Sequence, residues 1–216
     1  MARKVGSAGK TLARRLGRIA LVLLGFGFAV WLLVQLFAPW MGALALPLAF
    51  LAVMRLLQDK EVEREVVAKA RGYLGEARVG RVLEALPSPW RVFHDVDLGG
   101  ENADHVVVGP AGVFNVEVKN YTGLIRATPQ GLWVRGDRRD DLVRQAWRQA
   151  HKLRELLGVE VEPLLVFVGG RLEGRRVGRL PVLPPEEVGA YLRGLPARLS
   201  FTEAQRVSKL LEGRVR

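Results

Sequence analysis

The chain has 216 residues, no cysteine and a formal net charge of +11. Without cysteine, disulfides, thiolate zinc sites and cysteine nucleophiles are excluded. The charge is uneven: residues 1–57 hold seven basic side chains and no acidic one, so the chain from Gln58 on carries 26 basic against 22 acidic side chains, a net of +4. The overall basicity therefore argues only weakly for a nucleic-acid partner.

Residues 1–57 have the composition of a membrane anchor that follows a basic terminus. The run 19–38 contains no charged side chain, and the run 41–57 is charged only at Arg55. A helix of about 20 apolar residues crosses the ~30 Å hydrocarbon layer, so the first run is long enough and the second is marginal. Pro39 cannot continue a helix comfortably and is expected to lie in the turn. We predict a basic N-terminus over residues 1–18 and a transmembrane helical hairpin over residues 19–57.

Charge also predicts the orientation of this hairpin. Basic residues precede and follow it, whereas the intervening turn has none. By the positive-inside rule both termini and the soluble domain are expected in the cytoplasm, at the inner (cytoplasmic) membrane. A cleaved signal peptide is disfavoured because the first apolar run is too long and a second follows at once. A buried helical hairpin of a soluble protein is disfavoured because nothing polar interrupts either helix.

We predict a domain of mixed helices and strands over residues 58–170. A C-terminal extension over residues 171–216 is expected to pack on it. Hydrophobic periodicity and turn residues set the boundaries. The capping-box pattern Thr202-x-x-Gln205 is expected to open the last helix. In order, the predicted elements are a helix over 59–86, a strand over 90–96, a hairpin of strands 104–108 and 113–119, a second hairpin of strands 122–128 and 132–135, a helix over 138–157, a strand over 161–168, a glycine- and arginine-rich loop over 169–178, a strand near 179–183, and helices near 185–193 and 202–212.

A polar pattern interrupts the first of these hairpins, which is otherwise apolar. Asp104 opens one strand, and Glu117 and Lys119 lie on its neighbour. Residues two apart in a strand share a face, so Asn115, Glu117 and Lys119 are expected to project one way and the intervening apolar side chains into a core. Two carboxylates and an ammonium group form the arrangement that a divalent-metal phosphodiesterase needs. The residues alone therefore make this chain a nuclease candidate.

The spacing and order of several short motifs resemble the NERD (nuclease-related) domain over Gly72 to Val168. That family is assigned to the PD-(D/E)xK nuclease-like superfamily, so the resemblance implies an α/β fold with a restriction-endonuclease-like α-β-β-β-α-β core and a mixed sheet. The same order follows from the predicted elements. One departure is Ala103, which stands where the superfamily name has proline. The residues that carry the resemblance are Gly75-Glu76, Asp104-His105, Gly112-Val113-Phe114, Glu117-Val118-Lys119-Asn120, Gly123 and Gln145.

Carried over to this chain, the resemblance implies a catalytic set. Asp104 and Glu117 would be metal ligands and Lys119 the catalytic lysine, with Glu76 and Gln145 as acidic and polar residues from the two helices. Mg²⁺ (or Mn²⁺) held by Asp104, Glu117 and the carbonyl of Val118 would polarise the scissile phosphate of DNA or RNA. His105 alternates with Asp104 and is given a structural role as a buried, hydrogen-bonded imidazole.

Other interpretations of the same residues stay open. Glu117 and Lys119 could form a plain cross-strand ion pair, and a helical glutamate such as Glu76 is usually solvated. Arginines near 138–148 and 171–176 could contact phosphates or form a solvated surface. A membrane-tethered nucleic-acid-binding or scaffolding module without catalysis is the alternative function, and a small-nucleotide phosphodiesterase is a third. The sequence does not decide the strandedness of the substrate or the oligomeric state.

Overall fold

The computed structural model describes residues 3–5, 10–37, 48–52, 55 and 60–215. The chain divides into two compact units, one of Met1–Gly9 with Gly72–Arg216 and one of Lys10–Arg71. The larger unit holds every residue of the expected catalytic set.

The smaller unit contains helix α1 (Lys10–Phe37), a helical stretch at 48–52 and the beginning of α3 (Lys60–Glu84). Helix α1 begins nine residues before the apolar run predicted to start at Ile19. Most of the second helix predicted for the hairpin lies outside the described residues. Within the part of the chain that the structure describes, no helix combines the length and apolarity needed to cross a membrane.

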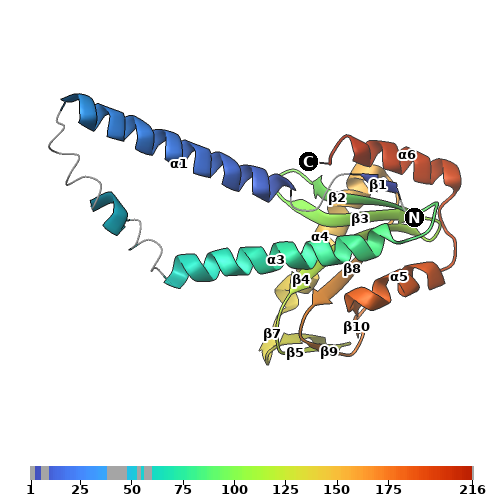
Figure 1. The fold of residues 1–216 in the computed structure, drawn as a ribbon. Helices are drawn as coiled ribbons and strands as arrows, with labels where there is room; N and C mark the ends of the chain where they lie inside the picture. Colours follow the sequence, from blue (N-terminus) through green and yellow to red (C-terminus); the bar gives the residue numbers. More distant parts are fainter. Residues whose placement is uncertain (1–2, 6–9, 38–47, 53–54, 56–59, 216) are drawn as a thin grey trace. The chain divides into compact units, whose positions relative to one another are not determined.

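The larger unit is built on a seven-stranded mixed sheet with the order β1-β2-β3-β4-β8-β11-β10 (Figure 1). Strands β2, β3 and β4 are antiparallel neighbours, and β8 joins β4 in parallel. The succession α3-β2-β3-β4-α4-β8 is the predicted α-β-β-β-α-β order. The bounds are β1 Arg3–Val5, β2 Arg91–Asp97, β3 Asn102–Gly109, β4 Gly112–Asn120, α4 Asp140–Leu157, β8 Val161–Val168, β10 Arg176–Val177 and β11 Leu180–Leu183.

Helices cover both faces of this sheet. On one face α3 and α5 (Pro185–Gly194) pack on alternate residues of β4, including Phe114, Val116 and Val118. On the other face α4 and α6 (Phe201–Glu212) pack on Val113 and its neighbours in β2 and β3. The face that carries Asn115 and Glu117 is therefore covered by a helix, and both side chains are buried.

A second sheet of four short strands, in the order β7-β6-β5-β9, is inserted mainly between β4 and α4. The loop predicted over 169–178 is wrong in part, because it contains β9 (Arg171–Glu173) and β10. Strand β9 pairs in parallel with β5, and Gly174 has a φ of +81° and lies so close that a Cβ would meet the carbonyl oxygen of Ala127 at 1.9 Å. Only glycine fits this approach. The other bounds are β5 Leu124–Thr128, β6 Gly131–Val134 and β7 Asp137–Arg138.

Helix α6 begins one residue earlier than predicted and uses a different cap. Ser200 is the N-cap: its hydroxyl accepts from the backbone N–H of Glu203, and the Glu203 carboxylate accepts from the Ser200 backbone. The predicted capping box at Thr202 and Gln205 is therefore wrong. Serine and glutamate three residues apart form the same motif two residues upstream, where the chain leaves its extended conformation.

Candidate functional site

The site lies where β3 and β4 cease to pair. Their antiparallel register extends from Gly109–Gly112 to His105–Val116. Beyond it, the backbone N–H of Val118 donates to Oδ2 of Asp104 at 2.7 Å. Here the Asp104 side chain, and not the backbone of β3, accepts a hydrogen bond from β4. The Asp104 carboxylate therefore lies beside the part of β4 that carries Glu117.

Glu117 is the centre of this group and is 1% exposed. Its Oε1 accepts from Nζ of Lys119 at 2.5 Å and from Nε2 of Gln145 in α4 at 2.7 Å. Its Oε2 is buried and has no hydrogen-bond partner among the described residues. Leaving a buried carboxylate oxygen unpaired is costly, so this atom is suited to a cation or a substrate donor.

Two neighbouring carboxyl groups are shifted toward the neutral form. Burial raises the pKa of Glu76 to about 7, helped by the charges of Asp95 and Glu117. Burial, then the charges of Glu117 and Glu76, raise the pKa of Asp104 well above its usual range. The shared perturbation shows that α3 brings Glu76 into the electrostatic reach of the β3–β4 site. Carboxyl groups crowded in this way are typical of sites that bind cations or move protons.

Lys119 places a positive charge among these carboxyl groups. Burial by itself would lower the pKa of Lys119, but the Glu117 carboxylate beside it raises the pKa above its ordinary value. The side chain is therefore an ammonium group at neutral pH, with about a fifth of its surface exposed. A fixed positive charge that retains access to solvent is available to a phosphate.

The donor set fits a hard divalent cation through oxygen atoms. Asp104 and Glu117 supply carboxylates, and one Glu117 oxygen is unpaired. Among the described residues, no group of three or more His, Asp or Glu side chains is arranged to hold a metal ion. A third protein ligand would therefore have to come from another kind of group, such as a backbone carbonyl, and the Val118 carbonyl stays a prediction.

Asp95 is a site neighbour that the sequence analysis did not identify. It has a φ of 54° in the middle of β2, and the β2–β3 register passes from His94–His105 to Val96–Ala103 around it. The Asn102 side chain donates to its Oδ1 at 2.7 Å, and its charge raises the pKa of Glu76. Strained backbone of this kind is concentrated at functional sites. The available signal was an aspartate interrupting an apolar strand.

His105 lies on the opposite face from Asp104, as predicted, in a buried chain of hydrogen bonds. Its Nε2 is 3.2 Å from the backbone oxygen of Glu76, which can only accept, so Nε2 carries the proton and Nδ1 accepts. The Nδ1 of His94, 2.8 Å away, must then donate, and its Nε2 faces Oε1 of Glu84 at 3.1 Å. Burial, then the charge of His94, lower the pKa of His105 to about 3, so His105 is neutral.

This chain of contacts joins β2 and β3 to α3 at the turn that carries Glu76. A Cβ at Gly80 would lie 3.3 Å from Cε1 of His94 and 3.5 Å from Cε1 of His105, so the helix backbone packs closely on both rings. The predicted structural role of His105 as a buried, hydrogen-bonded imidazole is confirmed.

Many of the arginines considered for phosphate binding are already paired. Arg138 and Arg139 bind Asp140 and Asp141, and Arg148 binds Glu101. Gln149 is buried, and its side-chain oxygen accepts from the Asn115 side chain at 3.1 Å. These contacts favour a structural role for this part of α4.

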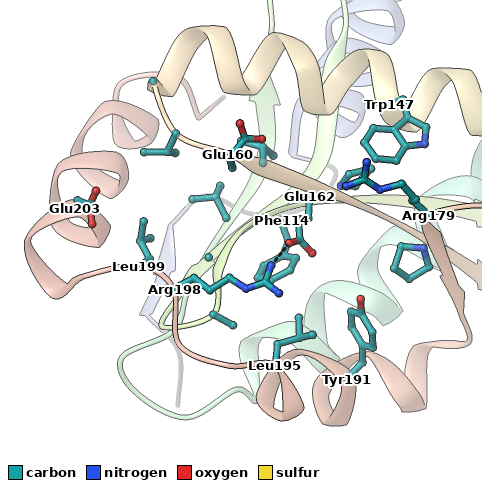
Figure 2. A pocket seen from close by; sticks show the side chains of 18 of the residues that line it. Phe114, Trp147, Glu160, Glu162, Arg179, Tyr191, Leu195, Arg198, Leu199 and Glu203 are labelled. Carbon is teal, nitrogen blue, oxygen red and sulfur yellow. Dashed lines mark hydrogen bonds and ion pairs between the residues drawn. The ribbon is translucent and has the colours of Figure 1, made fainter.

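The predicted site is separate from a cavity elsewhere on the main sheet. The cavity has a volume of about 830 Å³ and lies at the beginning of β4 and β8 (Figure 2). None of Glu76, Asp104, Glu117, Lys119 and Gln145 lines it. The site is a cluster of charged groups near the C-terminal end of β4, the central strand of the sheet.

Comparisons with known proteins find similarity over part of the chain. An uncharacterized protein of Bacillus anthracis is 35% identical over 103 residues, which are 44% of this chain and 48% of that protein. The chain therefore spans about half the length of this curated relative. The structure of SfsA from Pyrococcus furiosus in complex with Ca²⁺ matches 66% of this chain and 54% of its own at 13% identity, with a TM-score of 0.25 that supports no structural argument.

The model of the nuclease-related domain family (NERD) matches residues 71–168. This match begins within α3 and ends with β8, and it includes the β3–β4 hairpin and α4. The region similar to the nuclease-related domain thus coincides with the α-β-β-β-α-β core that carries the charged site.

Proposed function

We propose that this domain is a metal-dependent nuclease that hydrolyses phosphodiester bonds of DNA or RNA. The observation that carries the proposal is Glu117: a buried carboxylate with one oxygen bound by Lys119 and Gln145 and the other unpaired, beside Asp104. The match to the nuclease-related domain supports the same reaction class.

Each residue has a separate part in this proposal. Asp104 and Glu117 would hold Mg²⁺ or Mn²⁺, which supplies Lewis-acid polarisation of a phosphate and a more acidic water. Lys119 places an ammonium charge next to the same carboxylate, where it stabilises negative charge that develops on the phosphate. Gln145 fixes the orientation of Glu117, and Glu76 is a carboxyl group able to exchange a proton near neutral pH.

A cleavage assay tests this proposal. The chain is incubated with single-stranded DNA, double-stranded DNA and RNA in Mg²⁺, in Mn²⁺ and in EDTA. We expect cleavage only with a divalent ion, and we expect Glu117→Gln and Lys119→Ala to reduce it by about 100-fold or more, as for the loss of a principal transition-state interaction.

Two matched variants control for surface charge. Glu155→Gln and Lys152→Met remove charges of the same type outside the cluster, and both should retain wild-type cleavage. Activity that survives in EDTA, or that is unchanged by Glu117→Gln, would contradict the proposal.

One observation favours a second function, a nucleic-acid-binding or scaffolding module without catalysis. Lys119 and Gln145 already satisfy Oε1 of Glu117, which is also the pattern of a structural ion pair. A domain of this kind would bind nucleic acid equally well with and without Mg²⁺ and leave it intact.

Attachment to the inner membrane is a separate proposal that depends on residues 19–57. Its support is the uncharged run in α1, in which Leu21, Leu24 and Phe26 are each at least 70% exposed. Apolar side chains that water surrounds on a helix favour transfer to a lipid or protein environment. Both termini and the nuclease-related domain would then lie on the cytoplasmic side.

A further inference from the structure

The cavity at the beginning of β4 and β8 contains no residue of the proposed nuclease site. Its walls come from β4, α4, β8, the β10–β11 turn, α5 and the segment before α6 (Figure 2). Its volume of about 830 Å³ is within the range of roughly 300–1,000 Å³ typical of small-molecule sites.

The acidic residues of this cavity are already engaged. Glu162 binds Arg198 at 2.7 Å, and Glu160 binds Arg154 at 3.4 Å. Glu203 caps α6 through Ser200. Their negative charge is therefore offset within the protein or used by a helix terminus.

Two arginines of the same cavity are not engaged. Arg176 lies in β10 and Arg179 in the turn that leads to β11, and both are exposed. Neither guanidinium group has a hydrogen-bond or ion-pair partner among the residues that the structure describes. A guanidinium group binds phosphate through paired N–H donors, so two uncommitted arginines in one cavity favour a phosphorylated ligand.

Aromatic side chains also line the cavity, among them Trp147 and Tyr191. Trp147 of α4 is 40% exposed although it is a large apolar side chain, and Figure 2 shows it on the same side of the cavity as Arg179. Tyr191 of α5 is partly buried at another wall, and burial, then the charge of Glu162, raise the pKa of its hydroxyl, which stays a hydrogen-bond donor. Exposed aromatic faces of this kind stack on nucleic-acid bases.

We propose that this cavity is a second binding site, for a nucleoside 5′-phosphate that is either free or the end of an oligonucleotide. Arg176 and Arg179 bind the phosphate, and Trp147 stacks on the base. The site is distinct from the Glu117 cluster and does not require catalysis there.

Isothermal titration of the chain in EDTA tests the site with adenosine 5′-monophosphate, a 5′-phosphorylated dinucleotide, adenosine and inorganic phosphate. We expect saturable binding of adenosine 5′-monophosphate and of the 5′-phosphorylated dinucleotide. Arg176→Ala/Arg179→Ala should weaken it by about tenfold or more, and Arg193→Ala, an exposed arginine of α5 outside the lining, should leave it unchanged. Trp147→Ala should weaken the binding of both nucleotides and leave the binding of inorganic phosphate unchanged.

The outcomes separate this proposal from the nuclease proposal. Binding that persists in Glu117→Gln and is lost in the double arginine variant supports a second site, whatever that variant's effect on cleavage. Tighter binding of the dinucleotide identifies a strand end as the ligand, and tighter binding of the mononucleotide identifies a free nucleotide. No saturable binding, binding unchanged in the double variant, or phosphate bound as tightly as the mononucleotide would overturn the proposal. Circular dichroism of the double variant and the milder Arg179→Lys checks that any loss is local.

Discussion

At the scale of the residue, the site is governed by three carboxyl groups near one ammonium group. Glu76 and Asp104 have raised pKa values because burial and the charge of Glu117 disfavour their ionised forms. Lys119 offsets only part of the repulsion, since it is committed to Oε1 of Glu117. A divalent cation would relieve the remainder, because it supplies positive charge where the unpaired Oε2 lies.

This arrangement predicts the pH dependence of stability. The pKa of Glu76 is 4.5 in the unfolded chain and about 7 in the folded protein, so the folded state binds more protons between these values. The stabilisation is complete below pH 4.5 and is lost as the pH rises through 7, by about 3 kcal/mol at most. Thermal unfolding from pH 4.5 to 8 in EDTA should show the decline, and Glu76→Gln should make it smaller but not abolish it, because the pKa of Asp104 is raised as well.

A metal ion should reverse this loss. Adding Mg²⁺ at pH 8 should raise the unfolding temperature of the wild type, because binding to the folded state alone stabilises it. The double variant Asp104→Asn/Glu117→Gln should not respond. A rise of the same size in that variant would show that the ion binds elsewhere.

At the scale of the element, close packing positions the strands that carry the site. Trp90 lies so close to Gly109 that a Cβ at that position would be 2.1 Å from the indole ring. Gly109 ends β3 at the turn of the β3–β4 hairpin, and Trp90 immediately precedes β2. The hairpin that carries Asp104 and Glu117 is thus set against β2 by a contact at its far end.

Two glycines give a matched test of this packing. Gly109→Ala should destabilise the protein by about 1–3 kcal/mol, because the buried indole has to move. Gly72→Ala, in α3 with nothing within 4 Å of the new Cβ, should be neutral or stabilising by up to about 1 kcal/mol. Urea unfolding measures both, and equal effects would show that the indole contact does not constrain the hairpin.

The cap of α6 gives a second test at this scale. Ser200→Ala should lower the free energy of unfolding by about 1 kcal/mol, because it removes the acceptor of the Glu203 N–H. Thr202→Ala, at the exposed position that the sequence pattern favoured, should change it by less than about 0.5 kcal/mol. A larger loss at Thr202 would contradict the observed cap.

At the scale of the whole molecule, the chain combines a mixed α/β unit with a separate helical unit. The larger unit has three hydrophobic clusters of its own, which together engage both faces of the main sheet and one face of the small sheet. The smaller unit shows large apolar side chains of α1 on its surface. The larger unit therefore buries its apolar side chains, whereas α1 in the smaller unit exposes many of them.

Fractionation of lysed cells tests the proposed membrane attachment. We expect the chain to sediment with membranes and to be released by detergent but not by high salt, because apolar transfer is insensitive to charge screening. Replacing Leu24 and Phe28 by lysine should move the protein to the supernatant. Release of the wild type by salt alone would indicate surface adsorption through the basic N-terminus.

The sequence by itself determined the elements of the core and much of the candidate site. Period-two alternation placed Glu117 and Lys119 on one face of β4, and the structure confirms that Asn115 and Glu117 share the side covered by α4. Such local patterns can be predicted from the sequence because each follows from the geometry of one strand or one helix. The motifs of Glu76 and Gln145 were recognisable only through the resemblance to the nuclease-related domain, since neither residue is distinctive alone.

Only the tertiary structure decided which of these groups meet and how they titrate. The replacement of a backbone partner by Asp104 at Val118, the unpaired Oε2 of Glu117 and the approach of Glu76 from α3 depend on contacts between residues far apart in the chain. The same holds for Asp95 and for the pairing of β9 with β5. Sequence periodicity records which way a side chain points, whereas burial and electrostatic coupling depend on what the fold brings opposite it.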